Sequence, residues 1–595
     1  MKIKRIFSVV ITVVLLTSVF SSCGFISSQL LEYELNPNGN SYTLVSAAKF
    51  DGSEITVNRY RGKPVTEIGD YAFSKCENLE VVTLGECVTS VEYNAFRGCT
   101  ALKSVTMSDS VTYIGGSVFE NCSSLTDVTI PNGVTRIENS LFKGCSSLTS
   151  VVIPNGVTEI GYNAFDGCSS LTEIAIPQGV KRISREAFAG CEALTSITVP
   201  DSVSDISDAA FLNCKGLKSI NIGTGVSYIG TAAFYGCDSL DEVFIEDLKA
   251  WCDIWFGGGD FVGNSSSYFN SRDYLYELPT DFYDLPTDVL YSNPLMVAKQ
   301  LYVNGEPVSE LKIPAHISDI GAYAFVGYKG LTSLTFHSGT ITVGKGAFYN
   351  CDNLTNLKIT DRKHRIGDMA FYSCDGLTSV KIPNSTLGKE AFGSCNGLTS
   401  VTFYNGVKTI YESSFTNCEN LTSVTIPNSV TEIEETAFYG CKMLDGVIIG
   451  DNVKKIGASA FADCGSLTTV TIGSGVTEIG VGAFEDTGYY YNSDNWENGV
   501  LYIDDCLIEA KADIPEEYTV KNGTQCIAAY AFKNCGSLRI ITIPQSVKAI
   551  GKWAFDDCDS LSTVNYTGTQ AQWRDIGAQN AGIPYDIILN YNYEG

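Results

Sequence analysis

Apolar and polar residues follow one another along the chain in a pattern that recurs every 23 residues. A clear copy runs from Ala164 to Ile183. Its segment Leu171-x-x-Ile174-x-Ile176 ends in two alternating apolar residues, which is the periodicity of a β-strand with one buried face. Pro and Gly directly after this segment end the strand and turn the chain. The pattern therefore predicts one short strand and one turn in each copy.

Phenylalanine marks one position of this pattern eighteen times. Fifteen of these residues follow an Ala, sixteen have Cys three residues later, and seventeen have Leu six residues later. Such a period, within the range of about 20–29 residues, predicts a leucine-rich-repeat solenoid. The anchor phenylalanines are Phe73, Phe96, Phe119, Phe142, Phe165, Phe188, Phe211, Phe234, Phe325, Phe348, Phe371, Phe392, Phe415, Phe438, Phe461, Phe484, Phe532 and Phe555.

A single copy cannot bury its own apolar residues, so neighbouring copies must stack. We expect a curved right-handed coil with a parallel β-sheet on the concave face. Val180 and Ile183 are spaced to point inward from the far side of the coil, and Ala187-Phe188 starts a short helical or 3₁₀ turn on the convex face. Hairpin caps at the ends and two insertions complete the predicted architecture.

Breaks in the repeat divide the chain into eight expected segments. Solenoids need a cap over the first coil, and the turn-rich stretch 36–40 between two apolar runs predicts a hairpin there. The segments are a lipoprotein-type signal peptide (1–22), an N-terminal cap (23–60), a first repeat block (61–245), an aromatic and Gly-rich insertion (246–300), a second block (301–484), a hairpin insertion (485–525), a third block (526–566) and a C-terminal cap (567–595).

The N-terminus has the features of an export signal. Basic residues at positions 2, 4 and 5 precede a 15-residue apolar stretch, which is too short for a comfortable membrane span. Cys23 follows it and resembles the lipidated cysteine of a bacterial lipobox, although Phe20 and Ser22 depart from the preferred residues. We expect Cys23 to carry the lipid that anchors the protein to the membrane. Simple secretion is the alternative.

The chain has 21 cysteines, of which sixteen occupy the position three residues after an anchor phenylalanine. We interpret this ladder as reduced, buried thiols that act as small apolar groups and weak S–H donors. No ladder cysteine has another Cys or a His at metal-ligand spacing, so we expect no metal and no cofactor. Cys506 and Cys526 lie outside the ladder, and their spacing leaves open whether they form a disulfide.

The formal charge of −27 argues against a nucleic-acid partner, because such partners require clustered Lys and Arg. The three histidines form no zinc-protease motif, and the chain has no P-loop or nucleophile elbow. His364 stands in a basic stretch, where a solvated turn is expected and an anion site is the alternative. These observations favour a protein that is not an enzyme.

Two kinds of surface remain as candidates for binding. Thr stands between the two inward residues of the strand in nine of seventeen copies, which predicts a Ser/Thr ladder on the concave face. Strand propensity explains that ladder, and a broad, weakly adhesive surface is the alternative. Aromatic residues gather in the insertions, where we expect Trp251 and Trp496 to pack against the stack. The ligand-binding candidates are Trp255, Tyr268, Tyr274, Tyr276, Tyr489, Tyr490 and Tyr491.

The motif Ala-Phe-x-x-Cys-x-x-Leu-x-x-Val-x-Ile-Pro-x-x-Val-x-x-Ile-Gly resembles the BspA-like, or Treponema-type, leucine-rich repeat over nearly all of residues 61–566. The resemblance implies a bacterial surface protein that adheres to host matrix proteins or to other cells. The motif consists of core residues, so it carries over no ligand-binding residue. We expect a non-enzymatic, lipid-anchored protein that binds an extracellular protein or glycan. The alternatives are a structural spacer or envelope-coat protein and, more remotely, an enzyme with a site in residues 246–300.

Overall fold

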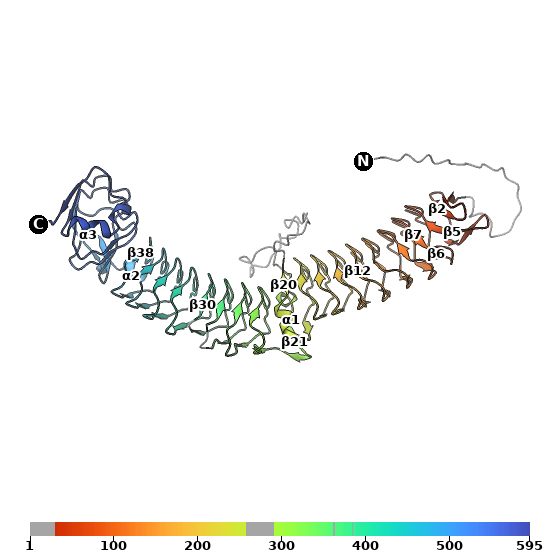
Figure 1. The fold of residues 1–595 in the computed structure, drawn as a ribbon, viewed down its shortest axis with the longest axis horizontal. Helices are drawn as coiled ribbons and strands as arrows, with labels where there is room; N and C mark the ends of the chain where they lie inside the picture. The colour runs from red at the N-terminus through yellow and green to blue at the C-terminus, as the bar shows by residue number, and fades with distance from the viewer. Residues whose placement is uncertain (1–29, 258–290, 361–362, 384, 595) are drawn as a thin grey trace.

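The computed structural model describes residues 30–257, 291–360, 363–383 and 385–594. The coils stack side by side into one elongated, curved array, with the first and last coils at opposite ends of the arc (Figure 1). Most coils contribute a strand to each of two parallel ladders. The predicted leucine-rich-repeat solenoid is thereby confirmed.

The first ladder, here called the long-strand ladder, contains the strands predicted from the alternating apolar residues. Residues one period apart face each other in it, as in the pairs Ser196↔Ser219 and Ser219↔Glu242. Its strands are β3 (Glu54–Val57), β6 (Val81–Leu84), β8 (Ser104–Met107), β10 (Asp127–Val128), β11 (Ser150–Val151), β13 (Glu173–Ile174), β15 (Ser196–Val199), β17 (Ser219–Ile222), β19 (Glu242–Ile245), β21 (Gln300–Val303), β23 (Glu310–Lys312), β25 (Ser333–Thr335), β27 (Asn356–Lys358), β29 (Ser379–Ile382), β31 (Ser400–Phe403), β33 (Ser423–Ile426), β35 (Gly446–Ile449), β37 (Thr469–Ile472), β42 (Glu517–Thr519), β44 (Ile540–Ile543), β46 (Thr563–Tyr566) and β47 (Ile588–Tyr591).

The second ladder, here called the short-strand ladder, follows the Pro-x-x-Val turn of each coil. Most of its strands have two residues, the first facing outward and the second, usually Ile, facing the core. Its strands are β5 (Lys63–Ile68), β7 (Ser90–Val91), β9 (Tyr113–Ile114), β12 (Glu159–Ile160), β14 (Arg182–Ile183), β16 (Asp205–Ile206), β18 (Tyr228–Ile229), β20 (Trp255–Phe256), β24 (Asp319–Ile320), β26 (Thr342–Val343), β28 (Arg365–Ile366), β30 (Thr386–Leu387), β32 (Thr409–Ile410), β34 (Glu432–Ile433), β36 (Lys455–Ile456), β38 (Glu478–Ile479), β43 (Cys526–Ile527) and β45 (Ala549–Ile550).

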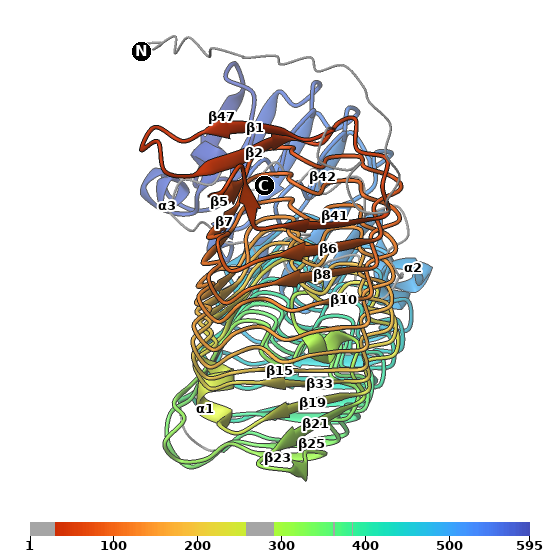
Figure 2. The ribbon, with the colours of Figure 1, turned by 90° about the vertical axis from the view of Figure 1, so that its right-hand side faces the viewer.

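The two ladders lie on opposite sides of the arc. In Figure 1, β7 and β20 of the short-strand ladder lie toward its inner side, and β6 and β21 of the long-strand ladder lie toward its outer side. Figure 2 shows β6, β8, β10 and β15 following one another along that outer side. A parallel sheet lines the concave face, as expected, but the short strands form it. The Ser/Thr ladder faces outward instead, because the direction of curvature depends on the spacing of every row of contacts between coils.

The anchor phenylalanines form three stacks inside the array, one in each repeat block, and all eighteen are fully buried. The ring of Phe165 lies 5.4 Å from that of Phe142 and 5.3 Å from that of Phe188, measured between centroids. The planes of Phe165 and Phe188 differ by 1°, so neighbouring rings stack in parallel. The expected burial of Phe165 between the anchors of adjacent coils is confirmed.

The turn around each anchor phenylalanine is not the helical or 3₁₀ piece expected from the sequence. Asn163 and Gly167 flank Phe165 in the left-handed conformation, with φ of 55° and 74°. Gly and Asn favour this conformation, which interrupts a helix. The N–H groups of Asn163, Phe165 and Gly167 donate to carbonyls of the next coil at 3.0, 2.8 and 2.8 Å. The turn therefore forms a third row of hydrogen bonds between coils.

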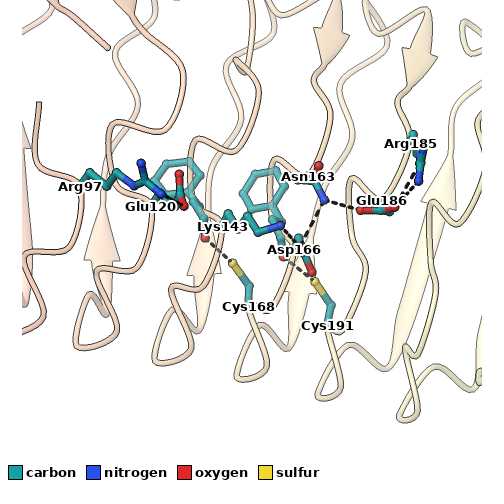
Figure 3. A network of polar contacts seen from close by, with 11 residues as sticks. Arg97, Glu120, Lys143, Asn163, Asp166, Cys168, Arg185, Glu186 and Cys191 are labelled. Atoms are coloured by element: carbon teal, nitrogen blue, oxygen red, sulfur yellow. Dashed lines mark hydrogen bonds and ion pairs between the residues drawn. The ribbon is translucent and has the colours of Figure 1, made fainter. Parts of the chain in front are cut away.

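The ladder cysteines are buried, and each donates its S–H to a backbone carbonyl of a neighbouring coil. Cys168 donates to the carbonyl of Phe142 at 3.2 Å and Cys191 to that of Phe165 at 3.3 Å (Figure 3). Burial raises the pKa of Cys145 to about 12, because the thiolate would lose its hydration. The interpretation as reduced, shielded thiols with a weak donor is confirmed.

This environment predicts how the thiols react. Cys122, Cys145, Cys168 and Cys191 should react slowly with a thiol reagent in the native protein, because the reactive thiolate is both shielded and disfavoured. All should react promptly after unfolding in denaturant. Cys87 is the internal control, since it alone is not buried among the twenty cysteines of the described residues. Prompt native reaction of the four ladder thiols, or disulfides between them in a peptide map, would contradict the account.

The ends of the array carry elements outside the repeat. At the start, β1 (Glu32–Leu35) and β2 (Tyr42–Ser46) form an antiparallel hairpin, and β2 pairs in parallel with β5. The short strand β4 (Arg59–Tyr60) pairs with β5 as well. At the other end, α3 (Gln570–Asp575) and η7 (Ala578–Asn580) precede the last strand, and Trp573 of α3 is buried.

The first insertion completes a coil rather than interrupting the stack. From β19 the chain passes through α1 (Leu248–Cys252) and β20, returns through η5 (Pro294–Met296), and enters β21. Strand β21 pairs directly with β19 and then turns back in β22 (Glu306–Pro307). Trp251 is buried and its Nε1–H donates to the carbonyl of Ala324 at 2.9 Å. The expectation that Trp251 packs the insertion onto the stack is confirmed.

The second insertion is a small module on the side of the array. It contains α2 (Gly488–Tyr491), η6 (Ser493–Asn495), β39 (Trp496–Glu497), β40 (Val500–Ile503) and β41 (Cys506–Ala510). Strands β39, β40 and β41 form an antiparallel meander, and β41 joins β43 in parallel. Cys506 and Cys526 are register partners in that pair, and both are free thiols.

Candidate binding surfaces

Trp255 lies in the short-strand ladder, on the inner side of the arc. It is the outward-facing residue of β20 and stands in register with Tyr228 of β18. About half of its side chain, 51%, is exposed to solvent. The sequence candidates Tyr268, Tyr274 and Tyr276 and the lipidation candidate Cys23 lie outside the described residues. Trp255 is therefore the one candidate of the first insertion that the structure places on a surface.

The three consecutive tyrosines of the second insertion have different environments. The Tyr489 hydroxyl donates to the carbonyl of Tyr502 at 3.0 Å and the Tyr490 hydroxyl donates to Glu509 at 3.0 Å, so both side chains hold the module together. Tyr491 points outward and is 69% exposed, and its hydroxyl donates to Asp486. Among these three candidates, Tyr491 offers the largest contact surface.

Aromatic rings pack at right angles around Tyr490. Its ring lies 5.7 Å from that of Tyr491 and 5.2 Å from that of Trp496, with interplanar angles of 90° and 83°. The ammonium group of Lys511 stands 4.6 Å above the Trp496 ring. Burial and the nearby Glu509 carboxylate raise the pKa of Tyr490, which therefore stays neutral. Trp496 is half-buried and packs the module, as the sequence suggested.

The two sets of aromatic candidates are not brought together. Figure 1 places β20 near the middle of the arc and α2 near its C-terminal end, many coils apart. A ligand that uses both would have to extend along the array. Trp255 and Tyr491 therefore define two separate candidate contact points.

His364 is buried, which contradicts the expected solvated turn. The Ile341 N–H donates to its Nδ1 at 3.2 Å, and its Nε2 lies 3.2 Å from the carbonyl of Thr360. The expectation was wrong because the basic neighbours suggested exposure, whereas the coil position decides it: His364 directly precedes β28 and fills the gap beside Phe336. Burial lowers the pKa of His364.

The buried imidazole predicts a pH dependence. The unfolded chain takes up a proton at His364 near pH 6.5, whereas the folded protein does so at a lower pH, so its stabilising contribution is complete above about 6.5 and declines as the pH falls below that value. Between pH 7.5 and pH 5.5, the free energy of unfolding measured in urea should fall less for His364→Asn than for the unchanged protein. Equal losses in the two proteins would contradict this assignment.

Charged side chains along the anchor turns pair across neighbouring coils. Arg97 contacts Glu120 at 2.8 Å and Lys143 contacts Asp166 at 2.7 Å, each pair being one period apart (Figure 3). Exposed pairs of this kind contribute little to stability, typically below about 1 kcal/mol. Their regular spacing favours the correct register between coils, and it occupies this side of the array with intramolecular contacts.

In the described part of the chain, no group of three or more His, Cys, Asp or Glu side chains is arranged to hold a metal ion. Within the same residues, no helix is both long and apolar enough to cross a membrane.

Stacked coils, a buried Leu and Phe stack and two parallel ladders define the class of this protein as a leucine-rich-repeat solenoid. The chain belongs to the family described as the BspA type leucine rich repeat region, which confirms the resemblance seen in the sequence. This family matches residues 43–172, 158–256, 296–387, 364–491 and 511–577.

Several solved structures resemble the array. A leucine-rich repeat protein of T. pallidum is 28% identical, with 36% of this chain and 89% of that chain covered and a TM-score of 0.29. One from Bacteroides ovatus is 18% identical, with 94% and 98% covered and a TM-score of 0.36. A leucine rich cell surface protein of Faecalibacterium prausnitzii is 22% identical, with 92% and 96% covered and a TM-score of 0.30. Comparison with curated proteins yields no match.

Proposed function

We propose that this chain is a non-enzymatic protein of the bacterial cell surface that binds an extracellular protein or glycan. The observation that carries the proposal is the exposure of Trp255 and Tyr491 on a rigid array of coils. Large aromatic side chains provide much contact area at a small loss of conformational freedom, and they dominate the energetics of many interfaces. The family, one of bacterial surface proteins, supports the location.

The insertions are favoured over the strands as contact regions. Ser and Thr are the commonest outward residues of the long-strand ladder, and their small side chains bury little area. Trp255 is held in β20, which pairs with β18, and Tyr491 is held in α2, which the Tyr489 hydroxyl joins to Tyr502 of β40. The proposal therefore assigns specific contacts to residues 246–300 and 485–525.

A pull-down with the purified chain lacking residues 1–23 tests the proposal. At least one member of a panel of immobilised extracellular matrix proteins and glycans should retain the chain. It should do so at a salt concentration that suppresses nonspecific electrostatic attraction. Capture of none of them would favour the alternative of a structural spacer or coat protein.

The anchor is tested separately. We expect Cys23→Ala to release the protein from the membrane fraction into the medium or periplasm, because the acceptor for the lipid would be lost. Immunoblots of the fractions measure this change, with Cys87→Ala as a control that should stay membrane-bound. A mature protein that begins at a residue before Cys23 would contradict lipidation at this position.

A further inference from the structure

Three tyrosines in the first repeat block are exposed at the same turn of the coil. Tyr93 and Tyr162 stand three residues before an anchor phenylalanine, and Tyr71 stands two residues before one. Their side chains are 49%, 49% and 57% exposed, respectively. We call these residues the tyrosine row. The row is separate from both insertions and from the Ser/Thr ladder.

Backbone hydrogen bonds fix the row along the array. The Tyr71 N–H donates to the Tyr93 carbonyl at 3.0 Å, and the Ser140 N–H donates to the Tyr162 carbonyl at 2.7 Å. Gly116 and Asn139 occupy the position of Tyr93 and Tyr162 in the two coils between them. Three coil steps separate Tyr93 from Tyr162, which at the spacing of paired strands is roughly 15 Å. Tyr93 and Tyr162 are thus two equivalent positions, three coil steps apart along the curved array.

The ring of Tyr93 is held in place by its neighbours. A Cβ atom at Gly116 would lie 3.3 Å from its Cε1 and 3.4 Å from its Cδ1, so the ring rests on the backbone of the next coil. Tyr113 adds an edge contact, with ring centroids 6.4 Å apart and planes 66° apart. A ring positioned in this way loses little further freedom when a ligand stacks on it.

The surface between the rings is polar. Glu138 and Asn139 lie in the coil before that of Tyr162. Arg136 pairs with Glu138 at 3.5 Å, and Asn139 accepts a hydrogen bond from the Tyr162 N–H at 2.9 Å. A protein hot spot needs neighbouring apolar contacts that exclude water, and these are replaced here by hydrogen-bonding groups. Arg136 also pairs with Glu159 at 3.2 Å, so it is already engaged and does not favour a polyanion. The pattern suits a ligand whose apolar patches and hydrogen-bonding groups also alternate.

We propose that the tyrosine row binds an extended, uncharged polysaccharide, with one pyranose ring on Tyr93 and another on Tyr162. The C–H face of a pyranose is weakly positive and complements the negative face of an aromatic ring. Its hydroxyls can bond with the amide and carboxylates between the platforms. This proposal rests on the proposed binding function. It specifies polysaccharide as the ligand class and adds the tyrosine row as a second binding face.

Affinity electrophoresis in native gels tests this assignment with the chain lacking residues 1–23. The gels contain dissolved mixed-linkage β-glucan, hydroxyethyl cellulose, glucomannan or arabinoxylan, and a gel without polysaccharide reports the fold. At least one polymer should retard the unchanged protein. Tyr93→Ala combined with Tyr162→Ala should abolish most of that retardation, a loss of at least about tenfold in affinity if each stacked sugar contributes as an interface anchor does. Tyr404→Ala with Tyr439→Ala, which removes two exposed rings of the second block, should leave it unchanged.

Two outcomes would overturn the proposal. One is the absence of retardation of the unchanged protein by all four polymers. The other is equal retardation of the unchanged protein and the Tyr93/Tyr162 variant at matched unfolding midpoints. If the same variant instead loses capture of a matrix protein while polysaccharide retardation stays, the row is a protein surface. If the protein is found elsewhere than at the cell surface, the proposed surface function is wrong. The gel result would still test polysaccharide binding by the tyrosine row.

Discussion

Replacing Phe165 with alanine is expected to lower the free energy of unfolding of the surrounding coils by about 3–5 kcal/mol. The ring is fully buried and overlaps both neighbouring anchors, whose centroids lie 5.4 and 5.3 Å away. Alanine would leave a cavity that Phe142 and Phe188 cannot fill, because each is held by its own neighbour in the stack. Amide hydrogen exchange measured by mass spectrometry resolves the loss coil by coil.

The effect should be local, because each coil contacts only the coils beside it. Exchange should accelerate in peptides around residues 142–188 and stay unchanged near Phe438. Phe165→Leu is the matched control, since it retains most of the buried volume and should destabilise less. Unchanged exchange in the alanine variant would show that the anchor stack does not hold the coils together.

Deleting residues 258–290 and joining the ends with a short Gly/Ser linker should keep the solenoid folded. The coil is completed by residues that remain: β21 pairs directly with β19, and Trp251 and Leu295 are buried in the core. The deletion removes Tyr268, Tyr274 and Tyr276. The affinity of the deletion variant for a partner that binds the intact chain should therefore fall by roughly 30-fold or more. This corresponds to the loss of an interface hot spot of about 2 kcal/mol.

Circular dichroism and the urea midpoint report folding of the deletion variant, and surface plasmon resonance reports its affinity. Charged substitutions at Thr129, Thr198 and Thr425 serve as the control for the outer ladder. A folded deletion variant with unchanged affinity, together with loss of binding in the threonine variants, would assign the ligand to the Ser/Thr ladder.

The core could be predicted because the same chemistry recurs at every period. Phe165 and Cys168 repeat in nearly every coil, so their burial follows from the impossibility of covering one coil by itself. The anchor turn was predicted less well. The frequent Gly or Asn two residues after the anchor, such as Gly167, signals a left-handed residue and could have excluded a helical piece.

Other features depend on information that one coil does not contain. His364 has basic neighbours, yet its position just before β28 directs the imidazole inward. The side toward which the array curves follows from small differences in spacing between coils, so the Ser/Thr ladder was assigned to the wrong face.

The sequence identified only some of the exposed aromatic residues. Trp255 and Tyr491 stood out because they interrupt the repeat. Tyr93 and Tyr162 fall inside it, at a turn position that is polar or small in most coils, so only their departure from that composition could have identified them.

Binding of three proteins to the same immobilised panel of matrix proteins and glycans tests the central claim most directly. The proteins are the unchanged chain, Trp255→Ser with Tyr491→Ser, and Thr198→Lys with Thr425→Lys. Because contact energy concentrates in large aromatic anchors, we expect the aromatic variant to lose affinity at least about tenfold and the threonine variant to stay within about twofold of the unchanged chain. Full affinity in the aromatic variant, with loss in the threonine variant, would contradict the account.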